Sequence, residues 1–230
     1  SKASHESWIR EFRICDKTEY EKVIKPETKP EKGTLKMGEV IRLVSELTKG
    51  DAIIVTDVGQ NQMSVARYYK FSNPNSLVTS GGMGTMGFGL PASVGAKIGK
   101  PDKQVVVFLG DGGFQMTIQE LGTILQYGVP VKIVVLNNSF LGMVRQWQDM
   151  FFAKRYASTE MVNPDFVTIA KGYDIPAKSI SKREDLKNGI VEMLDAEGPY
   201  LLDIKIDKEA NVLPMIEPGA SVSEVTLTYK

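Results

Sequence analysis

The sequence predicts an α/β fold in which helices cover both faces of a parallel β-sheet. Short apolar runs bounded by turn-forming residues alternate with longer segments whose apolar residues recur at helical spacing, as in strand–helix–strand units. The apolar runs are continuous rather than interrupted by polar residues, which is typical of strands buried on both faces of a sheet. The 230 residues suffice for one large domain of this kind with a sizeable core.

The expected elements alternate between residues 37 and 207. In chain order, they are a helix at 37–50, a strand within 51–60, a helix at 61–71, at most a three-residue strand within 72–80, a helix over the glycine stretch and 90–100, a strand within 103–113, a helix at 117–129, a strand within 130–139, a helix at 163–174, a strand at 175–180, a helix at 183–198 and a strand at 199–207. The helices have apolar residues three and four positions apart, and the strands are rich in Val, Ile and Leu. Gly50 ends the first helix, and Asn163 followed by Pro164 is the expected N-cap and first residue of the fifth.

Composition argues against several classes of partner. The 28 Lys and Arg residues balance the 28 Asp and Glu residues, so no net charge attracts the protein to nucleic acid or to an anionic membrane. The single cysteine, Cys15, cannot form an intramolecular disulfide, and no apolar run approaches the ~20 residues that span a bilayer. We therefore expect a cytoplasmic protein without nucleic-acid or membrane partners.

The first part of the chain has the composition of a connector. Residues 1–35 mix Lys, Glu and Pro, and the first residue is Ser rather than Met, so we expect 1–35 to be a linker from a preceding domain and 36–230 to be the ligand-binding domain. The only histidine, His5, lies in this linker. We expect it to be a solvated residue rather than a ligand, because sites form in pockets.

Polar and glycine-rich residues follow three of the expected strands, at 56–62, 110–113 and 137–143. The carboxyl ends of parallel strands lie at one edge of the sheet, where ligands bind in such folds. Asp111 and Asn138 are separated by about one strand-to-strand crossover, so their side chains can reach a common point. A carboxylate, an amide oxygen and a nearby carbonyl suit Mg²⁺ that keeps positions for water and phosphate.

Glycines at the same strand ends favour a phosphate group as the other ligand. Without a Cβ they let backbone N–H groups approach phosphate oxygens, and the helix expected after Gly113 directs its positive end to the same edge. These glycines are Gly59, Gly110, Gly112 and Gly113. The sequence therefore predicts a magnesium-bound diphosphate.

Two other interpretations of these motifs must be weighed. A lone Gly-Asp-Gly after a strand is more often a turn than a metal site, but its combination with Asn137-Asn138 at crossover spacing favours the metal site. The second interpretation is a dinucleotide site, because Gly82, Gly84 and Gly87 fit the G-x-G-x-x-G spacing and Asp111 could bind a ribose. The strand before these glycines is short, however, and a dinucleotide site leaves Asn137-Asn138 without a function.

The motifs together resemble a known family. Gly-Asp-Gly followed after 24 residues by Asn-Asn is similar to the cofactor motif of thiamine diphosphate enzymes. LTKGDAIIVTDVGQNQM, SGGMGTMGFGLPASVGAKIG, LGMVRQWQ and NVLPMIEPGA resemble the catalytic subunits of the acetolactate synthase (acetohydroxyacid synthase) family over nearly all of residues 36–220.

The resemblance implies roles for individual residues. Asp111 and Asn138 would bind magnesium through their side chains and Phe140 through its carbonyl. The diphosphate would be bound by Gly59, Gln60, Asn61, Gly112 and Gly113. Gly110 and Gly142 would also contact the cofactor, and Gly84 would pack near its aminopyrimidine ring. Met86 would be the wedge that bends thiamine diphosphate between its two rings, and Met143 and Trp147 would line the substrate pocket, with Trp147 influencing the choice of the second keto acid.

Each of these roles has a structural alternative. Met86 and Met143 could be ordinary core residues, Trp147 a buried packing residue, and Gln60 a helix cap. The chain also departs from the family at two positions, where Asn61 replaces the usual His and Gly113 replaces a frequent Ser. Asn61 can still donate hydrogen bonds to phosphate but cannot carry a positive charge.

The implied activity is the decarboxylation of pyruvate and its ligation to a second 2-keto acid, giving 2-acetolactate or 2-aceto-2-hydroxybutyrate, precursors of branched-chain amino acids. In the family, an N-terminal domain supplies the glutamate that activates the cofactor, and FAD binds a central domain, so we expect this chain alone to be inactive and without FAD. The family also implies a homodimer or tetramer and a small regulatory subunit. Alternatives are another thiamine diphosphate decarboxylase or carboligase and a non-catalytic magnesium-diphosphate subunit of a split enzyme.

Overall fold

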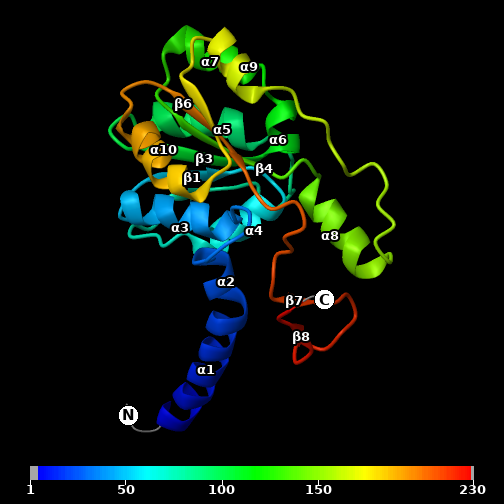
Figure 1. Ribbon diagram of the computed structural model, residues 1–230. Helices are drawn as coiled ribbons and strands as arrows, with labels where there is room; N and C mark the ends of the chain where they lie inside the picture. Colours follow the sequence, from blue (N-terminus) through cyan, green and yellow to red (C-terminus); the bar gives the residue numbers. More distant parts are fainter. Residues whose placement is uncertain (1–4, 229–230) are drawn as a thin grey trace.

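The computed structural model describes residues 5–228 and has a six-stranded parallel sheet at its centre (Figure 1). The strand order is β2-β1-β3-β4-β6-β5, with every pairing parallel. The strands are β1 (Ile53–Thr56), β2 (Leu77–Val78), β3 (Val105–Gly110), β4 (Lys132–Asn137), β5 (Ala177–Ile180) and β6 (Tyr200–Lys205). The predicted fold class and all six predicted strands are confirmed.

Two apolar cores lie on opposite faces of the sheet, because successive strand residues point to opposite faces. In β3, Val106 and Phe108 belong to one core, and Val107 and Leu109 belong to the other. The first core is covered by α3 (Met37–Leu47), α4 (Gln60–Tyr68) and α10 (Arg183–Asp195). The second is covered by α5 (Gly89–Gly99), α6 (Asp111–Met116), α7 (Glu120–Tyr127) and α9 (Phe166–Gly172). This double cover explains the continuous apolar strands.

The structure corrects several expected boundaries. The glycine stretch is not helical, because α5 begins only at Gly89 and residues 81–88 form turns. The helix after β3 begins at Asp111 itself rather than after Gly113. Two features had no counterpart in the expectations. They are α8 (Gly142–Phe151) and an antiparallel pair formed by β7 (Met215–Ile216) and β8 (Val225–Thr226).

The segment expected to be a linker is helical from residue 6 to residue 28. It consists of α1 (Glu6–Glu19), a π-helical turn (Tyr20–Ile24) and α2 (Lys25–Thr28). Figure 1 shows α1 projecting away from the sheet, and it contains no buried residue. His5 and Cys15 are both exposed.

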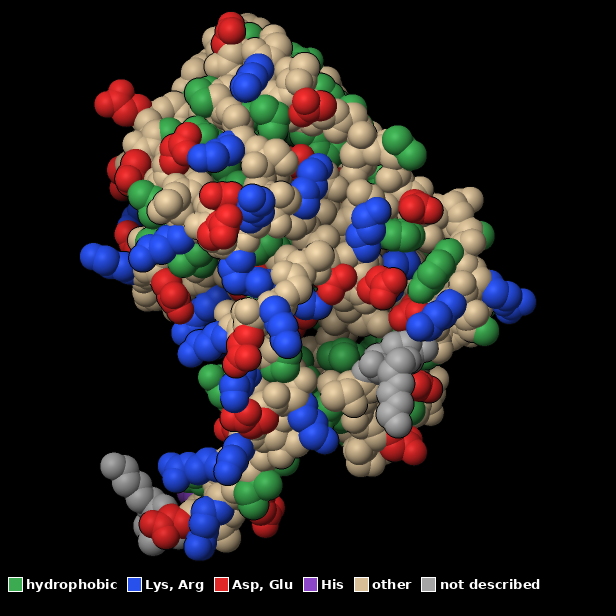
Figure 2. Space-filling model, viewed as in Figure 1, with side chains coloured by type: hydrophobic (Ala, Val, Ile, Leu, Met, Phe, Trp, Pro, Cys, Tyr) green, Lys and Arg blue, Asp and Glu red, His purple; other side chains and the backbone are tan. Residues whose placement is uncertain are grey.

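The charges of the protein are mixed on the surface. On the face drawn in Figure 2, Lys and Arg side chains are interspersed with Asp and Glu side chains, and neither sign forms a large separate patch. In the described part of the chain, no helix has both the length and the apolar character to cross a membrane.

Candidate functional site

A pocket opens at the carboxyl ends of β1, β3 and β4. Its lining consists of Met37, Val58, Gly59, Gln60, Asn61, Met86, Gly110, Asp111, Gly112, Gly113, Leu136, Asn138, Phe140, Leu141, Gly142, Met143 and Val144. The structure thus brings together every predicted site residue except Gly84 and Trp147. The enclosed volume is about 50 Å³, whereas ligand pockets commonly measure ~300–1,000 Å³.

Asp111 is the acidic group at the floor of this pocket. It is 1% exposed, and its Oδ1 accepts a hydrogen bond from the Gly112 backbone N–H at 3.1 Å. Its Oδ2 accepts one from Asn163 Nδ2 at 2.6 Å. Burial raises the pKa of Asp111, although these hydrogen bonds act in the opposite direction. A buried carboxylate of this kind gains from a neighbouring cation.

Asn138 and Phe140 bring neutral oxygen atoms to the same pocket. Asn138 Oδ1 accepts from the Phe140 N–H at 3.1 Å. Phe140 also forms an antiparallel bridge with Glu160, in which the hydrogen bonds are made by the neighbours on either side, Leu141 N–H to Thr159 O and Met161 N–H to Ser139 O. Since backbone groups alternate in direction along an extended chain, the Phe140 carbonyl points away from this bridge, to the side of Asn138.

The first turn of α4 follows β1 and lines the pocket, and the first backbone N–H groups of a helix have no partner within it. Its N-cap is Gly59, at φ 131° and ψ −154°, a region that is almost exclusive to glycine. Gly59 thus allows the chain to turn directly from strand to helix. Asn61 follows in this turn, and its side-chain Oδ1 is buried without a hydrogen-bond partner among the described residues. A buried amide oxygen without a partner at the edge of a pocket is suited to a hydrogen-bond donor.

The Gln60 side chain is already engaged within the protein. Its Nε2 donates to Gln146 Oε1 at 2.9 Å and to Ala210 O at 3.0 Å, and its Oε1 accepts from Asn138 Nδ2 at 3.4 Å. Gln60 makes no side-chain cap of α4, so the capping alternative is wrong. Its side chain holds Asn138 and leaves the backbone N–H for a ligand.

Asp57 fastens the glycine stretch to the same strand end. Its carboxylate accepts from the backbone N–H groups of Gly87 at 3.1 Å and Gly89 at 2.8 Å. This fixes the loop that carries Met86, which is half-buried and lines the pocket. Asp57 also accounts for the glycine at position 113, because a Cβ at Gly113 would lie 2.3 Å from Asp57 Oδ1. A serine there would require the carboxylate to move.

Gly84 and Trp147 lie outside the enclosed pocket. A Cβ at Gly84 would be 3.9 Å from Val58, a residue of the pocket lining. Trp147 lies on α8 with 41% of its surface exposed, and its ring packs edge-to-face on that of Phe151 with 5.1 Å between the ring centroids. The alternative that it is a buried packing residue is therefore wrong. Met143 lies one turn earlier on α8 and lines the pocket, and neither it nor Met86 is a core residue.

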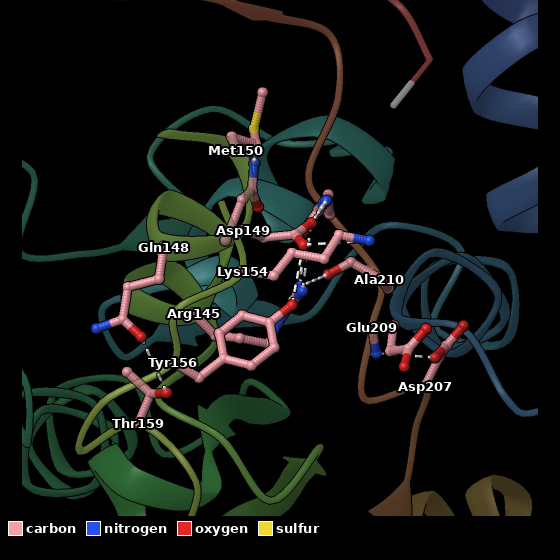
Figure 3. Close-up of polar contacts among 12 residues, drawn as sticks. Arg145, Gln148, Asp149, Met150, Lys154, Tyr156, Thr159, Asp207, Glu209 and Ala210 are labelled. Carbon is pink, nitrogen blue, oxygen red and sulfur yellow. Dashed lines mark hydrogen bonds and ion pairs between the residues drawn. The ribbon is translucent and has the colours of Figure 1, made fainter. Parts of the chain in front are cut away.

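A buried polar network positions α8. Figure 3 shows Arg145, Asp149 and Tyr156 pointing toward one another next to the segment that contains Ala210. Arg145 donates to Ala210 O at 2.6 Å, and Tyr156 donates to Asp149 Oδ1 at 2.9 Å. Burial alone would raise the pKa of Asp149, but hydrogen bonds from Asn211 and Tyr156 together with nearby cations hold this pKa below its ordinary value. The network fixes the helix that carries Met143 and Trp147.

Asn163 is not the N-cap of α9. The cap is Asp165, whose carboxylate accepts from the backbone N–H groups of Val167 and Thr168. Asn163 instead hydrogen-bonds to Asp111, which sequence reasoning did not predict. The bond joins residues 52 positions apart, and local start signals carry no information about such a contact.

The donor set of the pocket is poor in charge. Within residues 5–228, no group of three or more His, Cys, Asp or Glu side chains could hold a metal ion. Asp111 is the only carboxylate of the pocket lining in this part of the chain. One carboxylate with neutral oxygens and backbone N–H groups suits a hard cation that shares its coordination with a phosphate.

Comparisons with known proteins agree with this arrangement. The family model for the thiamine pyrophosphate enzyme, C-terminal TPP binding domain, matches residues 57–204. The chain is 46% identical over 197 residues to the acetolactate synthase large subunit of Lactococcus lactis subsp. lactis (strain IL1403), covering 85% of this chain and 34% of that protein. It is 44% identical to the acetolactate synthase isozyme 2 large subunit of Escherichia coli (strain K12), covering 81% of this chain and 34% of the relative.

A plant relative gives a similar result. Acetolactate synthase 1, chloroplastic, of Oryza sativa subsp. japonica is 47% identical over 195 residues, which cover 81% of this chain and 30% of the relative. The chain therefore spans about a third of the length of the relatives that it matches. From the match over residues 57–204 and the pocket at the strand ends, we conclude that this chain belongs to the thiamine pyrophosphate enzymes and comprises their C-terminal TPP binding domain.

Proposed function

We propose that this chain is the cofactor-binding part of an acetolactate synthase, which decarboxylates pyruvate and joins the product to a second 2-keto acid. The observation that carries the proposal is the 44–47% identity to acetolactate synthase subunits over more than four fifths of the chain. The pocket supports it, because residues with oxygen ligands and the first residues of α4 and α6 line it together, a combination that suits a magnesium-bound diphosphate.

Magnesium would be held by Asp111, the Asn138 side chain and the Phe140 carbonyl. The buried carboxylate supports this assignment, because a bound cation would offset the burial that raises its pKa. Asn138 and Phe140 both line the pocket, which supports their two neutral oxygens as further ligands. When bound, thiamine diphosphate supplies the electron sink for the decarboxylation.

The diphosphate would bind the backbone N–H groups at the start of α4 and of α6. Gly59, Gln60 and Asn61 contribute from α4, and Gly110, Gly112 and Gly113 line the floor beneath. The side-chain Nδ2 of Asn61, which makes only a long hydrogen bond of 3.5 Å to Val58 O, could donate to a phosphate oxygen. Gln60 would contribute its backbone rather than its side chain, since that side chain already binds Gln146 and Ala210.

The remaining roles concern orientation and substrate. Met86 would wedge between the two rings of the cofactor with Gly84 close by. Met143 and Gly142 would line the site from the start of α8, and Trp147, further along α8, would contact the second keto acid. The half-buried position of both methionines supports these roles, because each presents an adaptable apolar surface to the pocket.

The catalytic site would be completed by protein outside this chain. The enclosed volume of about 50 Å³ is well below the size of an ordinary ligand pocket. Asp111 is the only carboxylate among the described residues that line this pocket, and it would be engaged with the metal. A second domain would therefore supply the acid that activates the cofactor and a central domain would bind FAD. Association into a dimer or tetramer, with a regulatory subunit, would close the site.

The test is turnover with and without the rest of the protein. The full-length protein, incubated with pyruvate, magnesium and thiamine diphosphate, should form acetolactate. The 230-residue chain alone should not form it, and adding the separately expressed remainder should restore it. Formation of a decarboxylation product without acetolactate would point to another enzyme of the family. Turnover by the isolated chain at the full rate would contradict the proposed division of the site.

A further inference from the structure

Asn163 takes part in a hydrogen-bond network behind Asp111. Its Nδ2 donates to Asp111 Oδ2 at 2.6 Å and to Asn137 Oδ1 at 3.0 Å. Its Oδ1 accepts from Gln115 Nε2 at 2.9 Å. Both N–H donors and the oxygen of the amide are thus used, which leaves the side chain one orientation.

The network continues across the sheet to β6. Asn137 Nδ2 donates to Asp203 Oδ1 at 2.9 Å, and Asp203 Oδ2 pairs with Lys205 Nζ at 2.7 Å. Asn137 is 2% exposed and Asp203 is 3% exposed. Lys205 reaches the surface, with a side chain that is 45% exposed. A chain of contacts therefore runs from a surface cation to the carboxylate at the floor of the pocket.

The carboxylates at the two ends determine the direction of every bond between them. Asp203 accepts only, so Asn137 must present its Nδ2 there and its Oδ1 to Asn163. Asn163 must in turn present Nδ2 to Asn137 and to Asp111. Buried networks in which every member is satisfied hold their side chains rigidly. The network thus imposes one orientation on the Asp111 carboxylate.

We propose that Asn163 is a positioning residue, which holds Asp111 Oδ2 so that the carboxylate presents its remaining lone pairs to a cation in the pocket. This inference rests on the proposed binding of magnesium by Asp111. A neutral amide suits the role, because it orients the carboxylate by hydrogen bonding without neutralising its charge. Groups that orient metal ligands commonly change metal affinity by about 10- to 100-fold when they are removed.

The test is Asn163→Ala in the full-length protein, with Mn²⁺ as a paramagnetic substitute for Mg²⁺. We expect Mn²⁺ affinity in the presence of thiamine diphosphate to fall by about 10- to 100-fold. The electron paramagnetic resonance spectrum of the bound ion should also broaden, because Asp111 is no longer held in one orientation. A merely structural role for Asn163 would leave the spectrum of the bound ion unchanged.

Asp165→Ala is the matched control. It removes the N-cap of α9, which lies two residues after Asn163, without removing a contact to Asp111. The loss of such a cap lowers the stability of the helix by about 1 kcal/mol. Its Mn²⁺ affinity and spectrum should match the wild type. An equal loss in Asp165→Ala and Asn163→Ala would overturn the proposal, because loosening of α9 would then explain both.

Gln115→Ala provides a second test that leaves Asn163 in place. It removes the donor to Asn163 Oδ1 and should lower Mn²⁺ affinity in the same direction, but by less. Wild-type affinity and spectrum in both Asn163→Ala and Gln115→Ala would overturn the positioning role. Asp111→Ala distinguishes failure of the positioning role from failure of the proposed function. Undiminished Mn²⁺ binding by that variant would mean that Asp111 does not bind the metal.

Discussion

The two ends of β4 both carry buried polar side chains, but they use them differently. At the amino end, Lys132 is 3% exposed, and its Nζ donates to the carbonyl oxygens of Ala196 and Gly198, just after α10. At the carboxyl end, Asn137 and Asn138 form hydrogen bonds with groups from β6, α4 and the segment before α9. Both ends are polar and buried, but the candidate site of the TPP binding domain lies at the carboxyl end.

The difference shows what distinguishes a binding site from a satisfied buried charge. The hydrogen bonds of Lys132 are directed to the protein itself, next to the end of a helix where a cation is favoured. At the carboxyl end, Asn61 retains an unpartnered amide oxygen, and Asp111 is a carboxylate whose pKa is raised by burial. Burial alone therefore does not identify a site, and the convergence of incompletely satisfied groups does.

The largest effect that this comparison predicts is that of Asp111→Ala. The variant removes the only carboxylate among the described residues that line the pocket at the carboxyl ends of the strands. The affinity for thiamine diphosphate in the presence of magnesium should therefore fall by at least about 100-fold, which is more than the effect of losing a group that orients a metal ligand. Without cofactor, its free energy of unfolding should stay near the wild-type value, because the buried charge is itself costly. Titration calorimetry and denaturant unfolding of the full-length protein measure the two quantities.

Lys132→Met is the matched change at the other end of the strand. It should lower the free energy of unfolding, since two carbonyl oxygens lose their donor, and leave cofactor affinity unchanged. Equal cofactor affinity in wild type and Asp111→Ala, or a clear loss of affinity in Lys132→Met, would contradict the distinction between the two ends.

Both ends of β4 could be located from the sequence for the same reason. Runs such as 105–109 and 133–136 are apolar because both faces of the sheet are covered, so the strands and the polar residues after them could be located. In contrast, α8 could not be predicted from apolar periodicity, because the residues that it buries are Arg145, Gln146 and Asp149. Likewise, β7 and β8 have two residues each, too few for a periodic signal.

The site was predictable in its members but not in its connections. Strand-end residues and family motifs located Asp111 and Asn138, which both line the pocket. The role of Asn163 was missed, because a helix start signal is local while its hydrogen bond to Asp111 is not. The engagement of the Gln60 side chain with Gln146 and Ala210 is equally long-range. Contacts of this kind depend on the folded arrangement of α8 and the C-terminal segment.

A smaller effect is predicted for Gly142→Ala, which probes how closely the carboxyl end is packed. A Cβ at Gly142 would lie 2.3 Å from Gln60 Oε1 and 2.7 Å from Asn138 Nδ2, so it must displace side chains that border the proposed metal site. Overpacking of this kind costs about 1–3 kcal/mol, and we expect cofactor affinity to fall about 10-fold, the equivalent of 1.4 kcal/mol.

Gly95→Ala in α5 is the control for this change, because a Cβ there meets nothing within 4 Å. It should raise stability by about 0.5–1 kcal/mol, as expected for replacing a glycine within a helix, and leave binding unchanged. If Gly142→Ala bound the cofactor with wild-type affinity, the side chains at the carboxyl end of β4 would be able to move aside more easily than their close contacts indicate.

Trp147→Leu tests the outer wall of the site, which unlike the strand ends is largely exposed. Because Trp147 lies outside the enclosed pocket and is 41% exposed, cofactor affinity should not change. The free energy of discrimination between two competing keto acids should change by about 1–3 kcal/mol. It is obtained from the ratio of the two products in competition assays on the full-length protein. Phe152→Leu, an exposed aromatic at the end of the same helix, should leave the ratio unchanged. An unchanged ratio in Trp147→Leu would remove Trp147 from the substrate site.

The smallest predicted effect is the pH dependence that Lys132 gives to stability. Burial lowers the pKa of Lys132 from 10.5 to about 8, with a smaller contribution from the charge of Lys97. Between pH 8 and 10.5 the unfolded chain therefore binds more protons at this position than the folded chain, so the contribution of Lys132 to the free energy of unfolding rises with pH across this window. The pKa difference alone would correspond to about 3 kcal/mol. Hydrogen bonds with a charged partner contribute about 1.5–3 kcal/mol, so those from Nζ to Ala196 O and Gly198 O, which favour the ammonium form, reduce the expected rise to about 1 kcal/mol. Tyrosines also titrate near pH 10, so the quantity to measure is the difference in denaturant stability between wild type and Lys132→Met at each pH. That difference should grow in favour of the wild type from pH 8 to pH 10.5 and be level below pH 7. A difference that stays constant across the window would mean that the carbonyl groups fully offset the burial of the charge, and that the amino end of β4 is as well satisfied electrostatically as it is in its hydrogen bonds.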